Sequence, residues 1–340
     1  MSAPYASTVM TGNGTRSDRR PLVLAGLGAG CISASAVLVK LADTGTATTA
    51  VYRCFLALPV LVALAVAEQR RHGPRRAAAR GGAVLAGLFL AVDLVLWNHT
   101  IAEVGAGIAT VLGNLQVLFV ALTAWVLLRE RPERRFLIGL PVVMAGVVMV
   151  SGLAGNATGG IHPLAGVGYG IGTSLAYTAF LLIMRRTSAG VPHVAGPLAE
   201  ATAGAAVGSL ALGSAFGGLQ LHIPWHSFGW LLLLSLTSQT IGWLLITSSL
   251  PRLPAAISSL TLLLQPAAAM LLAAAVLGER PSLIQVAGAV VVCGGILWVS
   301  LAPPARRTDP PVPADPPVPV GIPASDDRAP VTPSPLASTS

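Results

Sequence analysis

Apolar stretches of about 18 to 25 residues recur along the chain, and each is long enough to cross a lipid bilayer as a helix. Polar and arginine-rich segments separate them. We predict an all-α polytopic membrane protein with ten transmembrane helices. The predicted spans are 22–41, 48–67, 81–98, 104–128, 136–153, 163–184, 195–216, 227–247, 254–277 and 283–302.

Charge is scarce in this sequence. Only 10% of its 340 residues are Asp, Glu, Lys or Arg, whereas soluble domains carry about 25%. So few charges exclude an ordinary cytosolic enzyme, and the 54% hydrophobic content excludes a disordered chain. Cys31, Cys54 and Cys293 lie in apolar stretches without a CxxC pattern, which predicts neither a disulfide framework nor a metal site.

The basic residues lie almost entirely on one side of the predicted topology. With a cytoplasmic N-terminus and ten spans, 18 basic residues are cytoplasmic, and Lys40, Arg53 and Arg280 alone lie on the other side. This positive-inside asymmetry predicts a plasma-membrane protein with both termini in the cytoplasm. The net charge of +8 therefore indicates orientation and does not indicate nucleic-acid binding.

Four regions follow from this pattern. We expect a cytoplasmic N-terminal segment (1–21), two five-helix units (22–153 and 154–302) and a disordered cytoplasmic tail (303–340). The tail is rich in Pro, which favours extended, solvated chain.

An internal repeat relates the two five-helix units. At an offset of 149, Gln116 aligns with Gln265, and the Glu-Arg-Pro motif at 130–132 aligns with that at 279–281. At an offset of 146, Asp93 and Trp97 align with Gln239 and Trp243. Because five is odd, the second unit enters the membrane with the opposite orientation. Such inverted repeats are typical of secondary transporters that work by alternating access.

These segments resemble a known family. The resemblance rests on VLFVALTAWVLLRERP at the end of the fourth span, LLLQPAAAMLLAAAVLGERP in the ninth, Lys40, and Arg53 in YRCFLALPVLVAL. They resemble the EamA-type ten-helix members of the drug/metabolite transporter superfamily. The resemblance implies two five-helix repeats and transport of small metabolites, often amino acids or other polar compounds, with export in many members. It does not identify the substrate.

Polar side chains inside the spans are the candidate substrate-binding residues. An Asp at the bilayer centre costs about 2.5–3.5 kcal/mol to insert, so Asp93 is expected to face a partner or a water-filled cavity. For the amides, pocket lining and bonding between helices both remain open. The predicted substrate-binding set is Asp93, Trp97, Asn114, Gln116, Tyr177, Gln239, Trp243 and Gln265.

Three further charged residues are candidates for gating or coupling: Lys40, Arg53 and Glu200. Lys40 and Arg53 near the outer ends of their spans serve either as snorkelling anchors or in a gate with Asp43 or Glu103. Glu200 lies in the weakest span, where a solvated position at the cytoplasmic end is the alternative. Glu130 and Glu279 end their spans, and we interpret them as helix-end and loop residues.

The alternative functions are a channel and a membrane-embedded enzyme. The sequence lacks a P-loop, an HExxH motif and a second secure intramembrane Asp, so we expect no enzyme activity, no cofactor and no metal. The expected partners are a small-molecule substrate and the lipid bilayer. Protons as the coupling ion and a homodimer remain open.

Overall fold

A computed structural model gives the architecture of the chain, and it describes residues 20–130, 132–151, 162–278 and 280–300. The predicted Pro-rich tail, almost all of the N-terminal segment and the boundary between the two predicted units lie outside these residues. So do Arg131 and Glu279 of the two Glu-Arg-Pro motifs.

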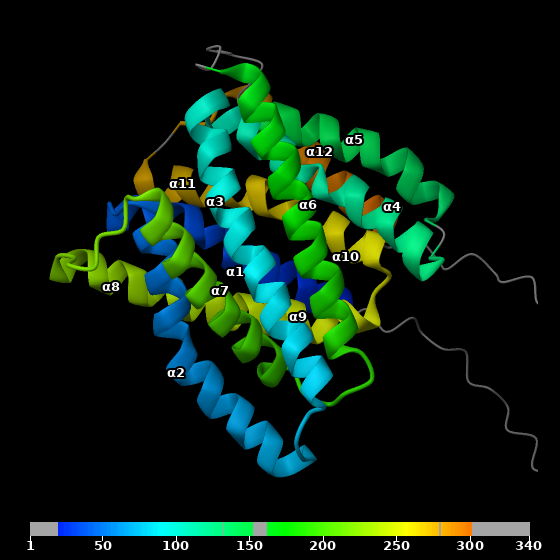
Figure 1. Cartoon of the computed structure of the whole chain (residues 1–340). Coiled ribbons are helices and arrows are strands. Elements are labelled where there is room, and N and C mark those ends of the chain that lie inside the picture. The colour runs from blue at the N-terminus through cyan, green and yellow to red at the C-terminus, as the bar shows by residue number, and fades with distance from the viewer. Residues whose placement is uncertain (1–19, 131, 152–161, 279, 301–340) are drawn as a thin grey trace, which may run out of the picture. The chain divides into compact units, whose positions relative to one another are not determined.

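The described part of the chain is helical and contains no strand (Figure 1). At least one helix overlaps each of the ten predicted spans. The helices are α1 Arg20–Ala42, α2 Thr46–His72, α3 Ala77–Asn114, α4 Gln116–Leu128, α5 Arg134–Val150, α6 Pro163–Ser188, α7 Ala195–Phe216, α8 Trp225–Leu234, the π-helix Ser235–Gly242, α9 Trp243–Ser249, the 3₁₀ turn Leu250–Arg252, α10 Ala255–Leu262, α11 Leu264–Leu277 and α12 Leu283–Ser300.

Within the described residues, seven segments are long and apolar enough to cross a membrane, and Leu283–Val299 is a shorter apolar helix. The 17-residue α5 and the Gly- and Ala-rich α7 are not among the seven. Seven crossings are therefore supported by length and hydropathy, whereas the full number of ten stays a prediction.

The third predicted span and the first part of the fourth form one continuous helical segment, α3, which folds back on itself. A straight helix would separate Trp97 from Gly113 by about 24 Å. A Cβ atom on Gly113 would instead lie 3.7 Å from Cδ1 of Trp97. The chain therefore reverses within α3, which explains why Ala77–Val104 and Ile108–Leu128 count as two separate apolar segments.

Two helix breaks occur at nearly equivalent places in the repeat. The backbone N–H of Leu115 donates to the Leu112 carbonyl at 3.1 Å, and that of Leu263 donates to the Leu260 carbonyl at 3.0 Å. Both bonds reach back three residues instead of four, as in a 3₁₀ turn. The helix axis is thus interrupted just before Gln116 and just before Gln265.

Equivalent helices of the two units run in opposite directions. A Cβ atom on Gly146 of α5 would lie 2.9 Å from Cγ2 of Val292 in α12, and one on Gly295 would lie 2.5 Å from Cγ2 of Val143. The later residue of α5 thus meets the earlier residue of α12. α2 and α7 are also antiparallel, because Gly213 lies against Ala47 while the Gly196 N–H binds Glu68. This arrangement supports an inverted repeat.

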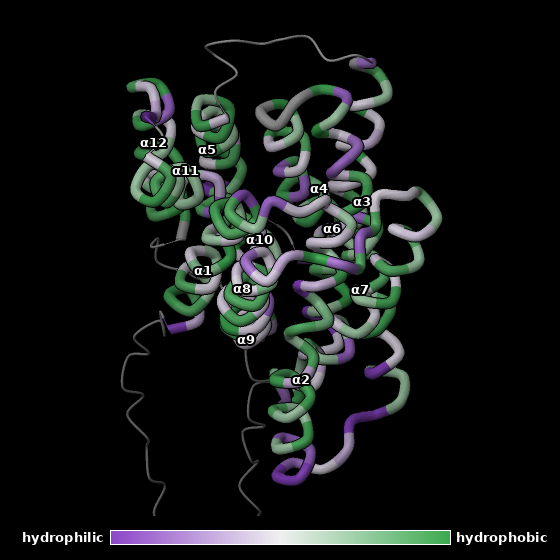
Figure 2. Tube along the Cα trace, turned by 90° about the vertical axis from the view of Figure 1, so that its left-hand side faces the viewer, coloured by the Kyte–Doolittle hydropathy of each residue, from purple (hydrophilic) through white to green (hydrophobic). Residues whose placement is uncertain are grey.

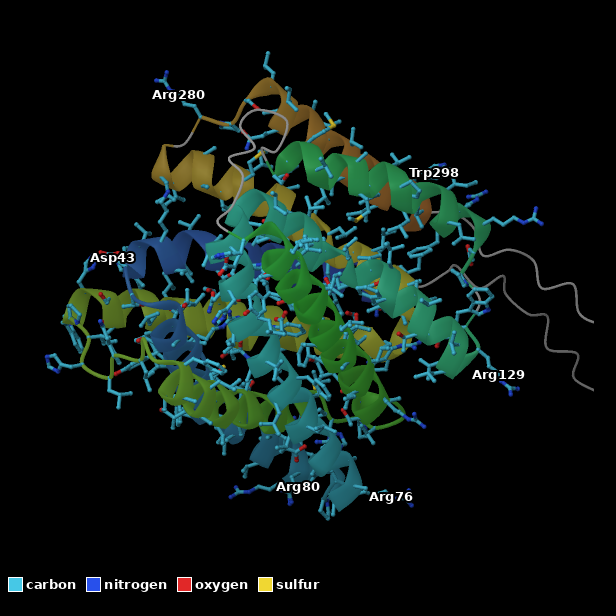
Figure 3. The ribbon with its side chains drawn as sticks, turned by 45° about the horizontal axis from the view of Figure 1, so that its top comes forward. Asp43, Arg76, Arg80, Arg129, Arg280 and Trp298 are labelled. Carbon is cyan, nitrogen blue, oxygen red and sulfur yellow. The ribbon has the colours of Figure 1, made fainter. Side chains whose placement is uncertain are left out.

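Polar residues gather where α2 connects to α3 (Figure 2). Arg75, Arg76 and Arg80 belong to this connection and to the start of α3. Figure 3 shows the side chains of Arg76 and Arg80 extending away from the helices, far from the labelled Asp43 and Arg280. This is the end of the helices that the charge pattern predicts to be cytoplasmic.

The inversion can be tested by thiol labelling. Arg129 and Arg280 are both exposed and follow the equivalent fourth and ninth spans. In a protein whose three native cysteines are replaced, we expect a membrane-impermeant maleimide to label Arg129→Cys from the cytoplasmic side and Arg280→Cys from the opposite side. Labelling of both positions from the same side would refute the inverted topology.

Candidate functional site

A cavity of about 500 Å³ lies among α1, α3, α4, α6 and α11 and reaches the ends of α5 and α12. Six of the eight predicted substrate-binding residues line it, and two do not. The lining residues among the predicted set are Asp93, Trp97, Asn114, Gln116, Tyr177 and Gln265. The structure thus brings together polar side chains from both repeat units.

Asp93 and Tyr177 are the two ionisable residues that line the cavity, and Asp93 is the one that carries a charge when ionised near neutral pH. Asp93 is a buried residue, 8% exposed. Among the described residues no side chain or backbone group donates a hydrogen bond to its carboxylate; Thr173 donates to its backbone carbonyl at 3.2 Å. A buried carboxylate without a donor is costly unless a charge or a ligand compensates it.

Two cavity-lining amides have a buried polar atom without a hydrogen-bond partner among the described residues. They are Oε1 of Gln116 and Nε2 of Gln265, which are equivalent residues of the repeat. Tyr177 interacts with the Gln265 side chain, and Asn114 Nδ2 is already used by the Thr110 carbonyl at 2.7 Å. The cavity therefore offers an unused amide on α4 and another on α11, one from each repeat unit.

Arg53 supplies a positive charge behind the cavity wall. Its guanidinium interacts electrostatically with Asp93 and Tyr177, although Arg53 is not a lining residue. Nε of Arg53 donates to Oε1 of Gln239 at 3.2 Å, and Nε2 of Gln239 donates to Thr202 Oγ1 at 3.2 Å. Gln239 is only 1% exposed and does not line the cavity, so in this conformation it holds Arg53 in place.

Trp243 also lies outside the cavity wall, although its repeat equivalent Trp97 is part of it. Trp243 is 3% exposed, whereas Trp97 is 39% exposed. The ring centroid of Trp243 lies 4.9 Å from that of Phe180 and 6.3 Å from that of Tyr177. Trp243 therefore packs in the hydrophobic core.

Lys40 and Glu200, the other predicted gating or coupling residues, do not line the cavity. Lys40 lies in the last turn of α1. Glu200 forms an ion pair with Arg75 and a second one with Arg80 at 3.0 Å. Glu103, a predicted alternative partner of Lys40 or Arg53, forms an ion pair with His162 at 3.1 Å.

Sequence reasoning missed several polar lining residues: Ser33 and Ser35 of α1, Ser151, Thr173 and Gln285. The one available signal was the Ser-x-Ser pattern inside the first apolar span, which places both residues in the C-terminal half of α1. No group of three or more His, Cys, Asp or Glu that could hold a metal ion occurs within the described ranges.

Comparison with known families matches the chain twice to one model. That model, described as the EamA-like transporter family, covers residues 20–152 and again 164–301. The chain belongs to the EamA-like transporter family. It is accordingly a multi-pass membrane protein with the transport role of that family, and the double match reflects its two-repeat architecture.

Other comparisons add the fold alone. A solved structure titled only "Crystal structure of protein" is similar to this EamA-like chain with a TM-score of 0.70 and 17% sequence identity. The similarity covers 83% of this chain and 98% of that one. No curated protein matches the chain.

Proposed function

We propose that this EamA-like protein is a secondary transporter that moves a small polar metabolite with a protonated amino group across the plasma membrane. The cavity is its substrate site, and Asp93 binds the amino group. The single observation that carries this proposal is a buried carboxylate, without a hydrogen-bond donor among the described residues, on the wall of a cavity lined by no Lys, Arg or His.

A substrate ammonium fits this carboxylate because it supplies both a compensating charge and hydrogen-bond donors. Within the protein, Arg53 supplies the compensating charge, and it approaches from the interior rather than from the cavity. The substrate ammonium therefore shares Asp93 with Arg53. A small organic cation or a zwitterion suits such a site better than an anion does.

The amides extend the recognition to a second polar group of the substrate. Gln265 offers an unused donor and Gln116 an unused acceptor in the same cavity. An amino acid satisfies both kinds of contact, because its ammonium lies on Asp93 while its carboxylate accepts from Gln265. The exposed Trp97 ring adds an aromatic face, which attracts cations.

We propose alternating access as the transport mechanism. The cavity extends toward Val150 at the end of α5 and Gln285 near the start of α12, on the side predicted to be non-cytoplasmic. Trp97 lies in this open half, whereas Trp243 is buried in the closed half. Exchange of the two environments between equivalent helices would open the cavity to the cytoplasm. Export, driven by a substrate or proton gradient, is the direction we propose.

The proposal can be tested by counterflow in proteoliposomes. Vesicles are preloaded with single compounds of similar size, namely amino acids, primary amines and monocarboxylic acids, and uptake of the matching radiolabelled compound is measured. We expect counterflow for at least one amine or amino acid and none for the carboxylic acids. Equal counterflow of carboxylic acids that lack an amino group would overturn the proposed substrate class.

A further inference from the structure

One ion pair joins three helices at the end of the structure opposite the cavity opening. Nη1 of Arg185, near the end of α6, donates to Oε1 of Glu130, which follows α4, at 2.7 Å. Arg185 also donates to the carbonyls of Leu250 at 3.2 Å and Leu253 at 3.1 Å. Oε2 of Glu130 accepts from the Ala255 N–H at 3.2 Å. The pair thus ties α4 and α6 to the connection between α9 and α10.

A small void lies directly beside this pair, and Arg185 is one of its lining residues. Its volume of about 10 Å³ is close to that of a single water-sized probe. Its walls are Val120, Leu181, Leu182, Arg185 and residues of the α9–α10 region, including Ser258. The Ser258 hydroxyl is buried and has no hydrogen-bond partner among the described residues. An unsatisfied buried hydroxyl on the wall of this void calls for an explanation, and contact with water in another conformation would supply one.

Three chain segments connect the cavity, the void and the ion pair in the same order. Along α6, Tyr177 lines the cavity, Leu181 the void, and Arg185 forms the pair. These steps are four residues each, or about 6 Å along the helix. Along α4 the order is Gln116, Val120 and Glu130. From α11 back to α10 it is Gln265, Ser258 and Ala255.

We propose that the Glu130–Arg185 pair is the cytoplasmic gate of this transporter and that the void is the closed section of its exit pathway, with Ser258 on the wall. This inference rests on the alternating access of the proposed function. The geometry suits a gate, because separating α4 from α6 breaks the ion pair and joins the void to the cavity. Arg185 and Glu130 are 17% and 35% exposed, so solvent can replace their contacts when they separate.

A second set of polar contacts, among α2, α3 and α7 at the same end, lies away from the cavity and the void. Glu68 of α2 accepts from the N–H groups of Val194, Ala195 and Gly196, and so caps α7. Glu200 of α7 pairs with Arg80, which is 61% exposed at the start of α3. None of these residues lines the cavity or the void. Arg80→Gln is therefore a control that removes one ion pair at this end, while Arg75 stays paired with Glu200.

The experiment measures access to Ser258. The full chain, with its three native cysteines replaced and its activity verified, carries Ser258→Cys, and an impermeant thiol reagent is applied to the cytoplasmic face of inverted vesicles. We expect Glu130→Gln to raise the labelling rate about tenfold, the factor for loss of one charge-assisted hydrogen bond. Arg80→Gln is expected to leave the labelling rate unchanged. When the reagent is applied to the opposite face, Glu130→Gln is expected to be labelled no faster than the parent.

A charge-swapped variant covers the case in which Glu130→Gln does not fold. Glu130→Arg combined with Arg185→Glu restores the pair, and we expect it to return labelling to the slow parental rate, whereas Glu130→Arg alone labels fast. Equal labelling rates in the parent, Glu130→Gln and the swapped variant would overturn the gate. Since labelling is measured without substrate, this failure would leave the proposed binding of amines by Asp93 standing.

Discussion

Asp93→Asn is expected to lower the kcat/KM of transport by about 30-fold or more while leaving the protein in the membrane. Removing one partner of a buried, hydrogen-bonded charge pair costs about 2–5 kcal/mol, and about 2 kcal/mol already corresponds to roughly 30-fold. Asn keeps the size of the side chain but cannot compensate an ammonium group. The measurement is initial-rate counterflow of the best amine or amino acid in proteoliposomes of matched protein content.

A companion variant separates the binding role from a folding effect. Asp93→Asn leaves Arg53 without its counter-charge, and a buried unpaired charge destabilises a protein. In Asp93→Asn/Arg53→Gln neither charge remains, so we expect membrane abundance and thermal stability near the parental values with transport still lost. Transport kinetics unchanged from the parent in Asp93→Asn would show that Asp93 does not bind the substrate.

Asp93, Gln116 and Gln265 were predictable as cavity residues because polar side chains inside apolar spans need a partner or water. Gln239 and Trp243 were placed beside them by repeat symmetry, and the structure places them elsewhere. The physical reason is that both side chains have partners in the protein interior: Gln239 is bonded to Arg53 and Thr202, and Trp243 packs against Phe180. The guanidinium of Arg53 donates a hydrogen bond to Gln239, whereas its interaction with Asp93 is electrostatic.

Features that depend on distant contacts had no signal in the local sequence. The helix breaks at Leu115 and Leu263 are an exception, because Gly113 and Asn114 precede the first break and Pro266 follows the second. Glu130 follows the end of α4, as the sequence predicts, but the sequence does not indicate its partner Arg185, which lies 55 positions away in the chain. Sequence periodicity finds the apolar spans, whereas ion pairs between their ends depend on how the helices pack.

Gly288→Leu is expected to destabilise the protein strongly by separating α5 from α12. A Cβ atom on Gly288 would lie 2.6 Å from Cβ of Met149, 2.8 Å from the Gly146 carbonyl oxygen and 2.9 Å from the Val150 nitrogen. Two of these neighbours are backbone atoms, which cannot move aside as a flexible side chain can. Overpacking costs about 1–3 kcal/mol, so we expect a melting temperature lower by about 5 °C or more.

Gly294→Leu on the same helix is the matched control, because Gly294 is exposed and a Cβ atom there would have no neighbouring atom within 4 Å. Both substitutions gain the same helix propensity, so that contribution cancels in the comparison. Detergent-solubilised proteins are compared by thermal melting followed by size-exclusion chromatography. Because α5 and α12 approach closely, we expect a large decrease in melting temperature for Gly288→Leu and a small change in melting temperature for Gly294→Leu. Equal melting temperatures for the two variants would contradict this packing, and with it the antiparallel contact on which the inverted repeat depends.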